Sequence, residues 1–126
     1  MNETDIFFET EIASYCYTNG ILIAHSKSVL RTVENIGNNV ATVKEQCKKR
    51  VPLLIHLTKS PIPSKATRQF STEQLPTVYT AMAMISKQGL AQFIMTLLFK
   101  VKPPPIPMRT FNNEEDAKQW LQQFIL

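Results

Sequence analysis

The 126-residue sequence lacks the features that mark several large classes of protein. Its two cysteines stand at unrelated spacing, which does not make a disulfide framework. Its three glycines, Gly20, Gly37 and Gly89, are isolated, so no glycine-rich phosphate loop is present. The longest apolar-rich stretch, residues 90–99, is about half as long as a membrane-spanning helix requires. The first dozen residues are acidic, unlike a signal peptide. We therefore expect a cytoplasmic protein without a transmembrane segment.

Groups suited to catalysis are equally scarce. His25 and His56 are the only histidines, and neither has a cysteine or carboxylate nearby at metal-ligand spacing. His56 lies within a predicted strand, where a hydrogen-bonded structural histidine is more common than a ligand. A Cys–His pair is conceivable, but the positions of Cys16 and Cys47 in predicted elements favour buried, unreactive thiols. We expect no enzyme activity, no metal site and no cofactor. We also expect no nucleic-acid partner, because no RNA-binding pattern with interleaved surface aromatics is present.

Charge is distributed unevenly along the chain. The net charge is +4, but residues 1–12 carry four acids and no base, whereas residues 13–109 carry thirteen bases and three acids. A basic body favours anionic partners such as phosphates or lipid headgroups. A solvated lysine-rich surface, balanced by the acidic ends, is the more ordinary explanation.

The apolar pattern predicts alternating strands and helices in a single domain, residues 1–126. Asn19-Gly20 between two β-rich runs predicts a hairpin, since both central residues of a type I′ turn need positive φ. The run 51–57 is nearly all apolar, which is typical of a strand inside a parallel sheet. The predicted order is strands within 6–27, a helix over 30–48, a strand over 51–57, a helix from Ser64 ended by Pro76, a strand over 78–85, a helix over 88–101, a strand over 108–111 and a helix capped by Asn113. This order indicates an α/β fold with a mostly parallel sheet, an N-terminal hairpin and about four helices.

The loop between the buried strand and the next helix is a candidate anion site. The carboxyl ends of parallel strands are where ligands commonly bind. Lys59, Lys65 and Arg68, together with the N–H groups at the helix start, would suit an anion. Ser60 or Ser64 could instead accept a phosphate, and an ordinary capped turn with solvated lysines is a third explanation.

The helix predicted over 88–101 is the most hydrophobic element in the chain. Its main apolar stripe suits packing against the sheet. Met95 and Phe99 lie outside that stripe, and we treat them as a candidate face for an apolar ligand or a partner. A second copy of the chain in a homodimer is one such partner.

The second half of the chain resembles the small bacterial proteins labelled STAS/SEC14-domain or SpoIIAA-like, most of which have no known function. The resemblance is carried by VPLLIHL at 51–57, Lys65 to Arg68 with Phe70, the strand with Ala81 and Ala83, Pro107 to Phe111, Glu114 to Ala117, and Trp120-Leu121. The element order of the whole chain is similar to that of the STAS fold of the SpoIIAA anti-sigma-factor antagonists. The resemblance thus implies a STAS-like, SpoIIAA-like domain. The Asp-Ser-Ser/Thr-Gly phosphorylation motif of those antagonists is missing, because the corresponding loop reads Leu57-Thr58-Lys59-Ser60-Pro61.

Two non-enzymatic roles in binding or regulation follow from the resemblance. Proteins of this fold, including the CRAL-TRIO lipid carriers, bind apolar ligands, which implies a lipid or other amphipathic anion here. Its apolar part would lie against the 88–101 helix and its headgroup near Lys59, Lys65 or Arg68. The alternative is a protein-interaction switch of the anti-sigma-factor-antagonist type, with a protein partner and phosphoregulation in the loop 58–64.

Overall fold

The computed structural model describes residues 5–86, 89–90, 93 and 104–126. Within them, one six-stranded sheet runs in chain order, β1-β2-β3-β4-β5-β6. The strands are β1 (Ile6–Glu9), β2 (Ala13–Thr18), β3 (Ile21–Ser26), β4 (Val51–His56), β5 (Tyr79–Ile85) and β6 (Met108–Phe111). The first three strands pair antiparallel and the other three pairings are parallel. The predicted α/β class, with a hairpin leading into a parallel sheet, is confirmed.

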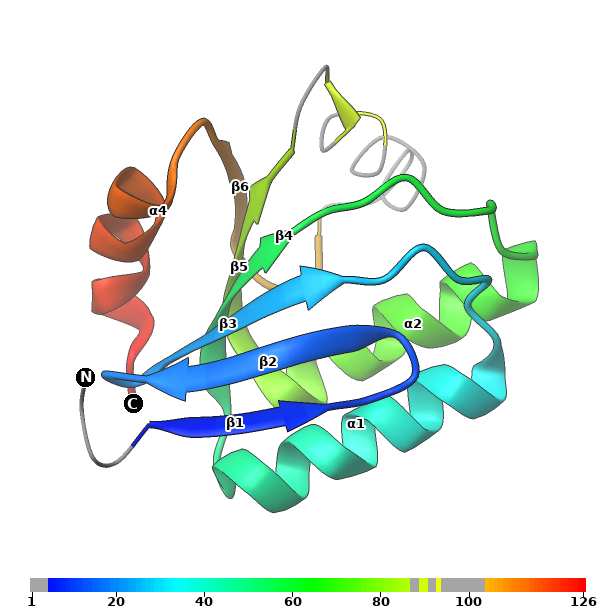
Figure 1. The fold of residues 1–126 in the computed structure, drawn as a ribbon, viewed down its shortest axis with the longest axis horizontal. Coiled ribbons are helices and arrows are strands. Elements are labelled where there is room, and N and C mark those ends of the chain that lie inside the picture. Colours follow the sequence, from blue (N-terminus) through cyan, green and yellow to red (C-terminus); the bar gives the residue numbers. More distant parts are fainter. Residues whose placement is uncertain (1–4, 87–88, 91–92, 94–103) are drawn as a thin grey trace.

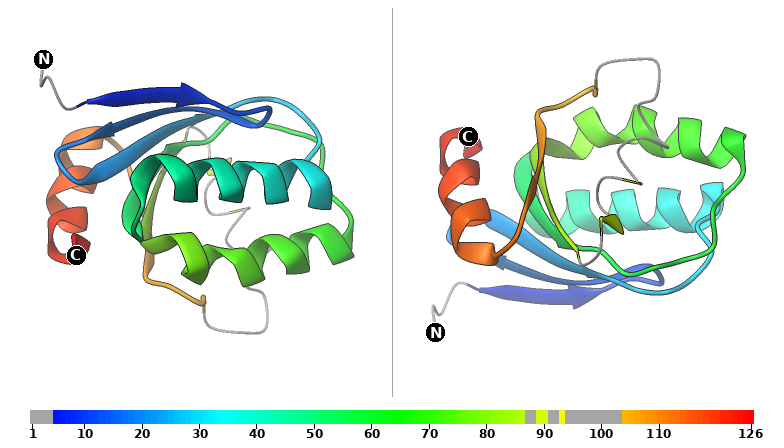
Figure 2. Two further views of the ribbon diagram at one scale, coloured as in Figure 1. Left: turned by 90° about the horizontal axis from the view of Figure 1, so that it is seen from below. Right: turned by 90° about the horizontal axis from the view of Figure 1, so that it is seen from above.

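Helices cover both faces of the sheet (Figures 1 and 2). Helices α1 (Val33–Cys47) and α2 (Lys65–Val78) lie side by side on one face, and α4 (Glu114–Leu121) lies on the other. A 3-10 turn, η1 (Gln122–Phe124), follows α4. The expected number of about four helices is slightly too high for the described residues, which hold three α-helices. No described helix is long and apolar enough to cross a membrane.

The turn and cap residues act as their chemistry predicts. Asn19 and Gly20 have φ values of 52° and 81° and close the β2–β3 hairpin. Thr32 caps α1 by accepting from the backbone N–H of Asn35 at 3.0 Å. Asn113 caps α4 by accepting from the N–H of Asp116 at 2.9 Å. These local signals therefore set where the elements begin.

Pro76 does not end α2, which corrects the sequence prediction. The helix continues to Val78, and the N–H of Tyr79 still bonds the carbonyl of Leu75. In the last turn, proline removes only its own N–H from the helix, and the buried side chains of Leu75 and Val78 keep that turn packed. Arg50 donates to the Pro76 carbonyl at 3.2 Å and satisfies a group that the helix end would leave unpaired.

Each face of the sheet has its own apolar core. On one face, side chains such as Leu22 and Leu53 pack with Val43 of α1 and Leu75 of α2. On the other face the core consists of Ile21, Leu54, Ala81, Ala83, Ala117 and Leu121. The small Ala81, Ala83 and Ala117 allow α4 to lie close to the strands. Because side chains alternate along a strand, His25 and His56 share the α4 face with Ile21 and Leu54.

The helix predicted over 88–101 falls largely outside the described residues. Met95 and Phe99 lie entirely outside them.

Candidate functional site

A hollow of about 640 Å³ lies at the carboxyl ends of β4 and β5. It is lined by His56, Leu57, Lys59, Ile85, Ser86, Gly89, Leu90, Phe93 and Asn112. Three segments form it: the residues that follow β4, those that follow β5, and the turn before α4. The carboxyl end of a parallel sheet is the place where open α/β folds hold ligands. The hollow therefore has the position, at the carboxyl ends of parallel strands, that is common for ligand sites in such folds.

The wall of this hollow is mainly apolar. Leu57, Ile85, Leu90 and Phe93 supply it, and the Phe93 side chain is half exposed, at 50%. Lys59 is exposed and adds a positive charge to the lining. An apolar wall with one cation is complementary to a molecule with an apolar part and an anionic group.

The three predicted anion-binding bases do not gather at one place. Of the three, Lys59 alone lines the hollow. Lys65 is the first residue of α2, and its side chain is exposed. The guanidinium of Arg68 donates to the carbonyl of Pro63 at 2.7 Å, so it braces the loop instead. The loop after β4 reaches across the molecule before α2 begins (Figure 1), which separates Lys65 from the hollow.

The two candidate phosphoacceptors lie in different surroundings. Ser60 is partly buried, where its hydroxyl donates to the carbonyl of Lys27 at 3.3 Å and accepts from Arg31 at 3.3 Å. Ser64 is exposed and caps α2, accepting from the N–H of Thr67 at 3.2 Å. Both hydroxyls have structural roles, and Ser64 is the more accessible.

Neither cysteine is a reactive thiol by its surroundings. Burial raises the pKa of Cys47 to about 11. Burial, together with the charge of Asp5, also raises the pKa of Cys16. Thiolate is the reactive form, so both side chains are poor nucleophiles near neutral pH. Cys47 is buried as predicted, whereas Cys16 is only partly buried.

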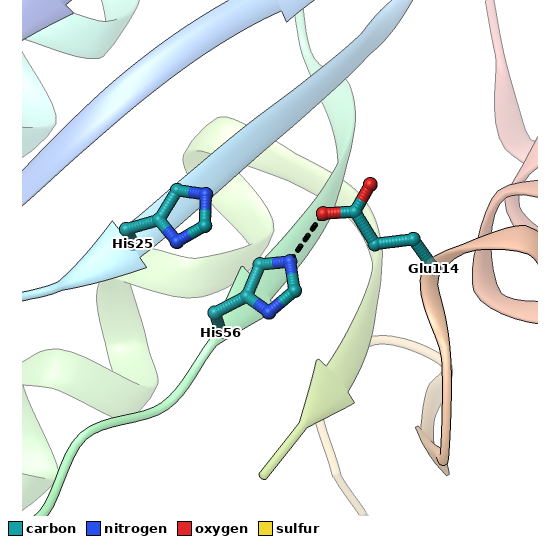
Figure 3. Close-up of side chains that lie close together, drawn as sticks. All are labelled: His25, His56 and Glu114. Atoms are coloured by element: carbon teal, nitrogen blue, oxygen red, sulfur yellow. Dashed lines mark hydrogen bonds and ion pairs between the residues drawn. The ribbon is translucent and has the colours of Figure 1, made fainter.

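A group of polar side chains on the α4 face adjoins the hollow and shares His56 with its lining. His25 and His56 are register partners on the parallel strands β3 and β4, and their rings stack with centroids 4.4 Å apart and planes 2° apart. Glu114, the first residue of α4, points at them and its carboxylate bonds Nε2 of His56 (Figure 3). His56 is thus a hydrogen-bonded strand histidine, as expected. We call these three residues the His–His–Glu cluster.

Glu114 is held in its ionised form. Burial alone would raise the pKa of its carboxyl group. The hydrogen bond and charge of His56 and of Lys118 outweigh burial and leave that pKa below its ordinary value. The Lys118 ammonium lies 3.4 Å from the other carboxylate oxygen, one helical turn along α4. The carboxyl group of the cluster is therefore an anion near neutral pH.

The sequence analysis missed this cluster because its members lie far apart in the chain. Only the parallel pairing of β3 with β4 and the docking of α4 bring them together. One signal was available: each histidine stands an even number of positions after an apolar residue on the same face, His25 after Ile23 and His56 after Leu54. When two neighbouring parallel strands both end in such a histidine, the two rings lie at the same carboxyl end of the sheet and on the same face.

A comparison with solved structures supports the fold. An uncharacterised protein of the DUF3478 family from Shewanella loihica PV-4, with a SpoIIAA-like fold, has a similar structure with a TM-score of 0.58 and 15% identity over 94% of this chain and 92% of that one. An anti-sigma factor antagonist from Mycobacterium paratuberculosis gives a TM-score of 0.48 and 12% identity over 94% and 93%. No curated protein matches the chain significantly. The SpoIIAA-like resemblance seen in the sequence is thus confirmed as a likeness of fold. Residues 15–125 match the family described as a domain of unknown function, DUF7793, and the chain belongs to that family.

Proposed function

We propose that the protein is a non-enzymatic binding module for a lipid or other amphipathic anion. The apolar part of the ligand occupies the hollow beyond β4 and β5, and its anionic group lies at Lys59. The observation that carries this proposal is the hollow itself. Its volume of about 640 Å³ falls within the roughly 300–1,000 Å³ of small-molecule sites.

The lining indicates how such a ligand would be held. Leu57, Ile85 and Phe93 offer apolar surface whose burial favours an alkyl chain. Each buried CH₂ contributes about 0.8 kcal/mol, so affinity rises by up to about fourfold per carbon. The Lys59 ammonium adds an attraction for a carboxylate or phosphate headgroup that an uncharged headgroup lacks.

The test is a titration of the full chain with saturated fatty acids of increasing length below their micelle concentration, followed by calorimetry. We expect affinity to increase with chain length and the corresponding alcohols to bind more weakly. Lys59→Glu should weaken fatty-acid binding by about tenfold and leave alcohol binding unchanged. Lys65→Glu is the matched control, since Lys65 is equally exposed and lies off the hollow. Absence of binding, or an equal loss in the control, would overturn the proposal.

A second candidate function is a protein-interaction switch at Ser64, the alternative that the fold resemblance raised. The observation that favours it is an exposed hydroxyl at the start of α2, followed directly by Lys65. A phosphate at a helix N-terminus is stabilised by the helix dipole and by nearby cations. Intact-mass and peptide analysis of protein purified from its own cells should find phosphate on Ser64 and none on the partly buried Ser60. Protein from actively growing and from starved cells that carries no phosphate on Ser64 would eliminate the switch.

A further inference from the structure

We propose that the His–His–Glu cluster, formed by His25, His56 and Glu114, binds a divalent transition-metal ion of the zinc type. One ligand atom from each of the three side chains lies within 4.8 Å of the other two. Two imidazoles and one carboxylate are a donor set that suits Zn²⁺, whereas Mg²⁺ and Ca²⁺ prefer oxygen ligands throughout. Three protein ligands leave the fourth tetrahedral position to water or to another ligand.

The backbone holds the three ligands together at the carboxyl ends of β3 and β4. His25 and His56 occupy partner positions at the ends of β3 and β4. Glu114 is presented by the capped first turn of α4, which packs on the same face of the sheet. The positions of all three Cα atoms are therefore set by regular elements rather than by a loop, which favours a preorganised site.

Small side-chain rotations complete the site. Zinc bonds of about 2.0–2.1 Å place tetrahedral ligand atoms roughly 3.3 Å apart, so atoms now up to 4.8 Å apart must approach by about 1.5 Å. Because an imidazole lone pair lies in the ring plane, two rings that are stacked and parallel cannot both direct a lone pair at one ion. His25 is the ring that turns, since its side chain is exposed and is held by stacking on His56.

Charge around the cluster favours and tunes the site. The Glu114 carboxylate supplies a negative charge for the metal. Lys118 faces the same carboxylate at 3.4 Å and competes with a cation for it. Neutralising Lys118 should therefore tighten metal binding, an effect that a merely structural His–Glu contact would not produce.

Titration of the ligand-free protein with Zn²⁺ against a chromophoric chelator tests this inference without any amphipathic ligand. We expect one Zn²⁺ per chain in the wild type. His25→Gln, His56→Gln and Glu114→Gln should each weaken binding by at least about tenfold, since loss of an outer-shell partner alone costs that much. Lys118→Met should tighten binding. Glu115→Gln is the matched control, because it removes an exposed carboxylate from the same helical turn.

Three further measurements keep the test decisive. Circular dichroism identifies variants that unfold, and His25→Gln, whose side chain is exposed, is the variant expected to remain folded. Cys16 is a free, partly exposed thiol on β2 and is the competing zinc ligand to exclude. If zinc binds at the His–His–Glu cluster, Cys16→Ser retains the zinc affinity of the wild type. The d–d absorption of the cobalt-substituted protein should be that of an ion with a low coordination number. The spectrum should lack a thiolate charge-transfer band. Equal binding by wild type and His25→Gln, or loss of binding in Cys16→Ser, would overturn the assignment.

Discussion

Asn39 shows how one buried side chain links helix α1 to strand β2 and to the turn that precedes it. It projects from α1, is 6% exposed, and its Oδ1 accepts from the Thr10 hydroxyl at 2.7 Å and from the Tyr15 hydroxyl at 2.8 Å. Burial raises the pKa of Tyr15, and it raises that of Tyr79 still further. Both phenols therefore stay protonated over the working pH range and remain hydrogen-bond donors.

Replacing Asn39 should destabilise the protein more than any exposed asparagine. Asn39→Ala leaves the buried Tyr15 hydroxyl without this acceptor, which costs about 1–3 kcal/mol. Asn38→Ala is the matched control, since Asn38 is the exposed neighbour on the same helix. Urea unfolding gives the free energy of unfolding for both variants. Equal values would show that the Asn39 contacts contribute nothing to stability.

Glu114 should give the protein a component of acid sensitivity. Its folded-state pKa lies below the ordinary value of 4.5, so its stabilising effect is present above pH 4.5 and is lost as the pH falls through the lowered value. The side chain is 37% exposed, and solvent screening limits the effect to no more than about 1 kcal/mol. Glu114→Gln should lower the free energy of unfolding at pH 7 and converge with the wild type as the pH falls through the lowered pKa of Glu114.

Glu115→Gln serves as the control for this pH dependence, because it shares the first turn of α4 but not the contact with His56. Its unfolding free energy should follow the wild type from pH 7 to pH 3. If both variants showed the same pH profile, the helix dipole rather than His56 and Lys118 would explain the effect.

At the scale of the elements, alanine substitutions at two glycines should change the stability in opposite directions. An added Cβ at Gly37, in the middle of α1, meets nothing within 4 Å, so Gly37→Ala should stabilise the protein by about 0.5–1 kcal/mol. At Gly20 the backbone φ is +81° and an added Cβ would lie 3.1 Å from the side chain of Ile125. Gly20→Ala should therefore lower the melting temperature while Gly37→Ala raises it. Thermal unfolding of the two variants side by side decides the matter, and a shared direction of change would refute the argument.

Local chemistry made most elements predictable from the sequence. The Asn19-Gly20 turn, the apolar run of β4 and the Asn113 cap each depend on neighbouring residues and on the preferences of φ or of helix N–H groups. The prediction that Pro76 ends α2 was wrong because the effect of a proline depends on its position in the helix. In the last turn Pro76 removes one hydrogen bond. The burial of Leu75 and Val78 stabilises the turn in spite of that loss, and this packing cannot be read from the sequence.

The candidate site was less predictable, because it depends on strand pairing. The position of Lys59 directly after β4 is visible in the sequence, and Lys59 lines the hollow at the carboxyl end of that strand. The separation of Lys65 from Lys59 depends on the path of an extended loop that carries no periodic pattern. The meeting of His25 with His56 depends on the register between β3 and β4, and that register comes from packing on both faces of the sheet.

For the whole molecule, the strand order predicts a gradient of local stability. Strands β3, β4 and β5 are paired on both sides, whereas β1 and β6 form the two edges of the described sheet. Amides of the central strands should exchange with deuterium most slowly, and those of β1 fastest among the strands, since an edge strand opens with fewer broken contacts. Hydrogen–deuterium exchange resolved by peptide provides the measurement. Protection of β1 equal to that of β4 would contradict this gradient.

The late position of α4 in the chain affects folding during synthesis on the ribosome, because this helix covers one face of the sheet. Ile21 and Leu54 on that face are covered by Ala117 and Leu121, and the hairpin turn at Gly20 lies against Ile125. At a synthesis rate of about 5–20 residues per second, the covering helix follows β4 only after several seconds. During that interval the nascent chain carries apolar side chains of the α4 face without the helix that covers them. Apolar surface exposed in this way is prone to aggregation until α4 packs on it.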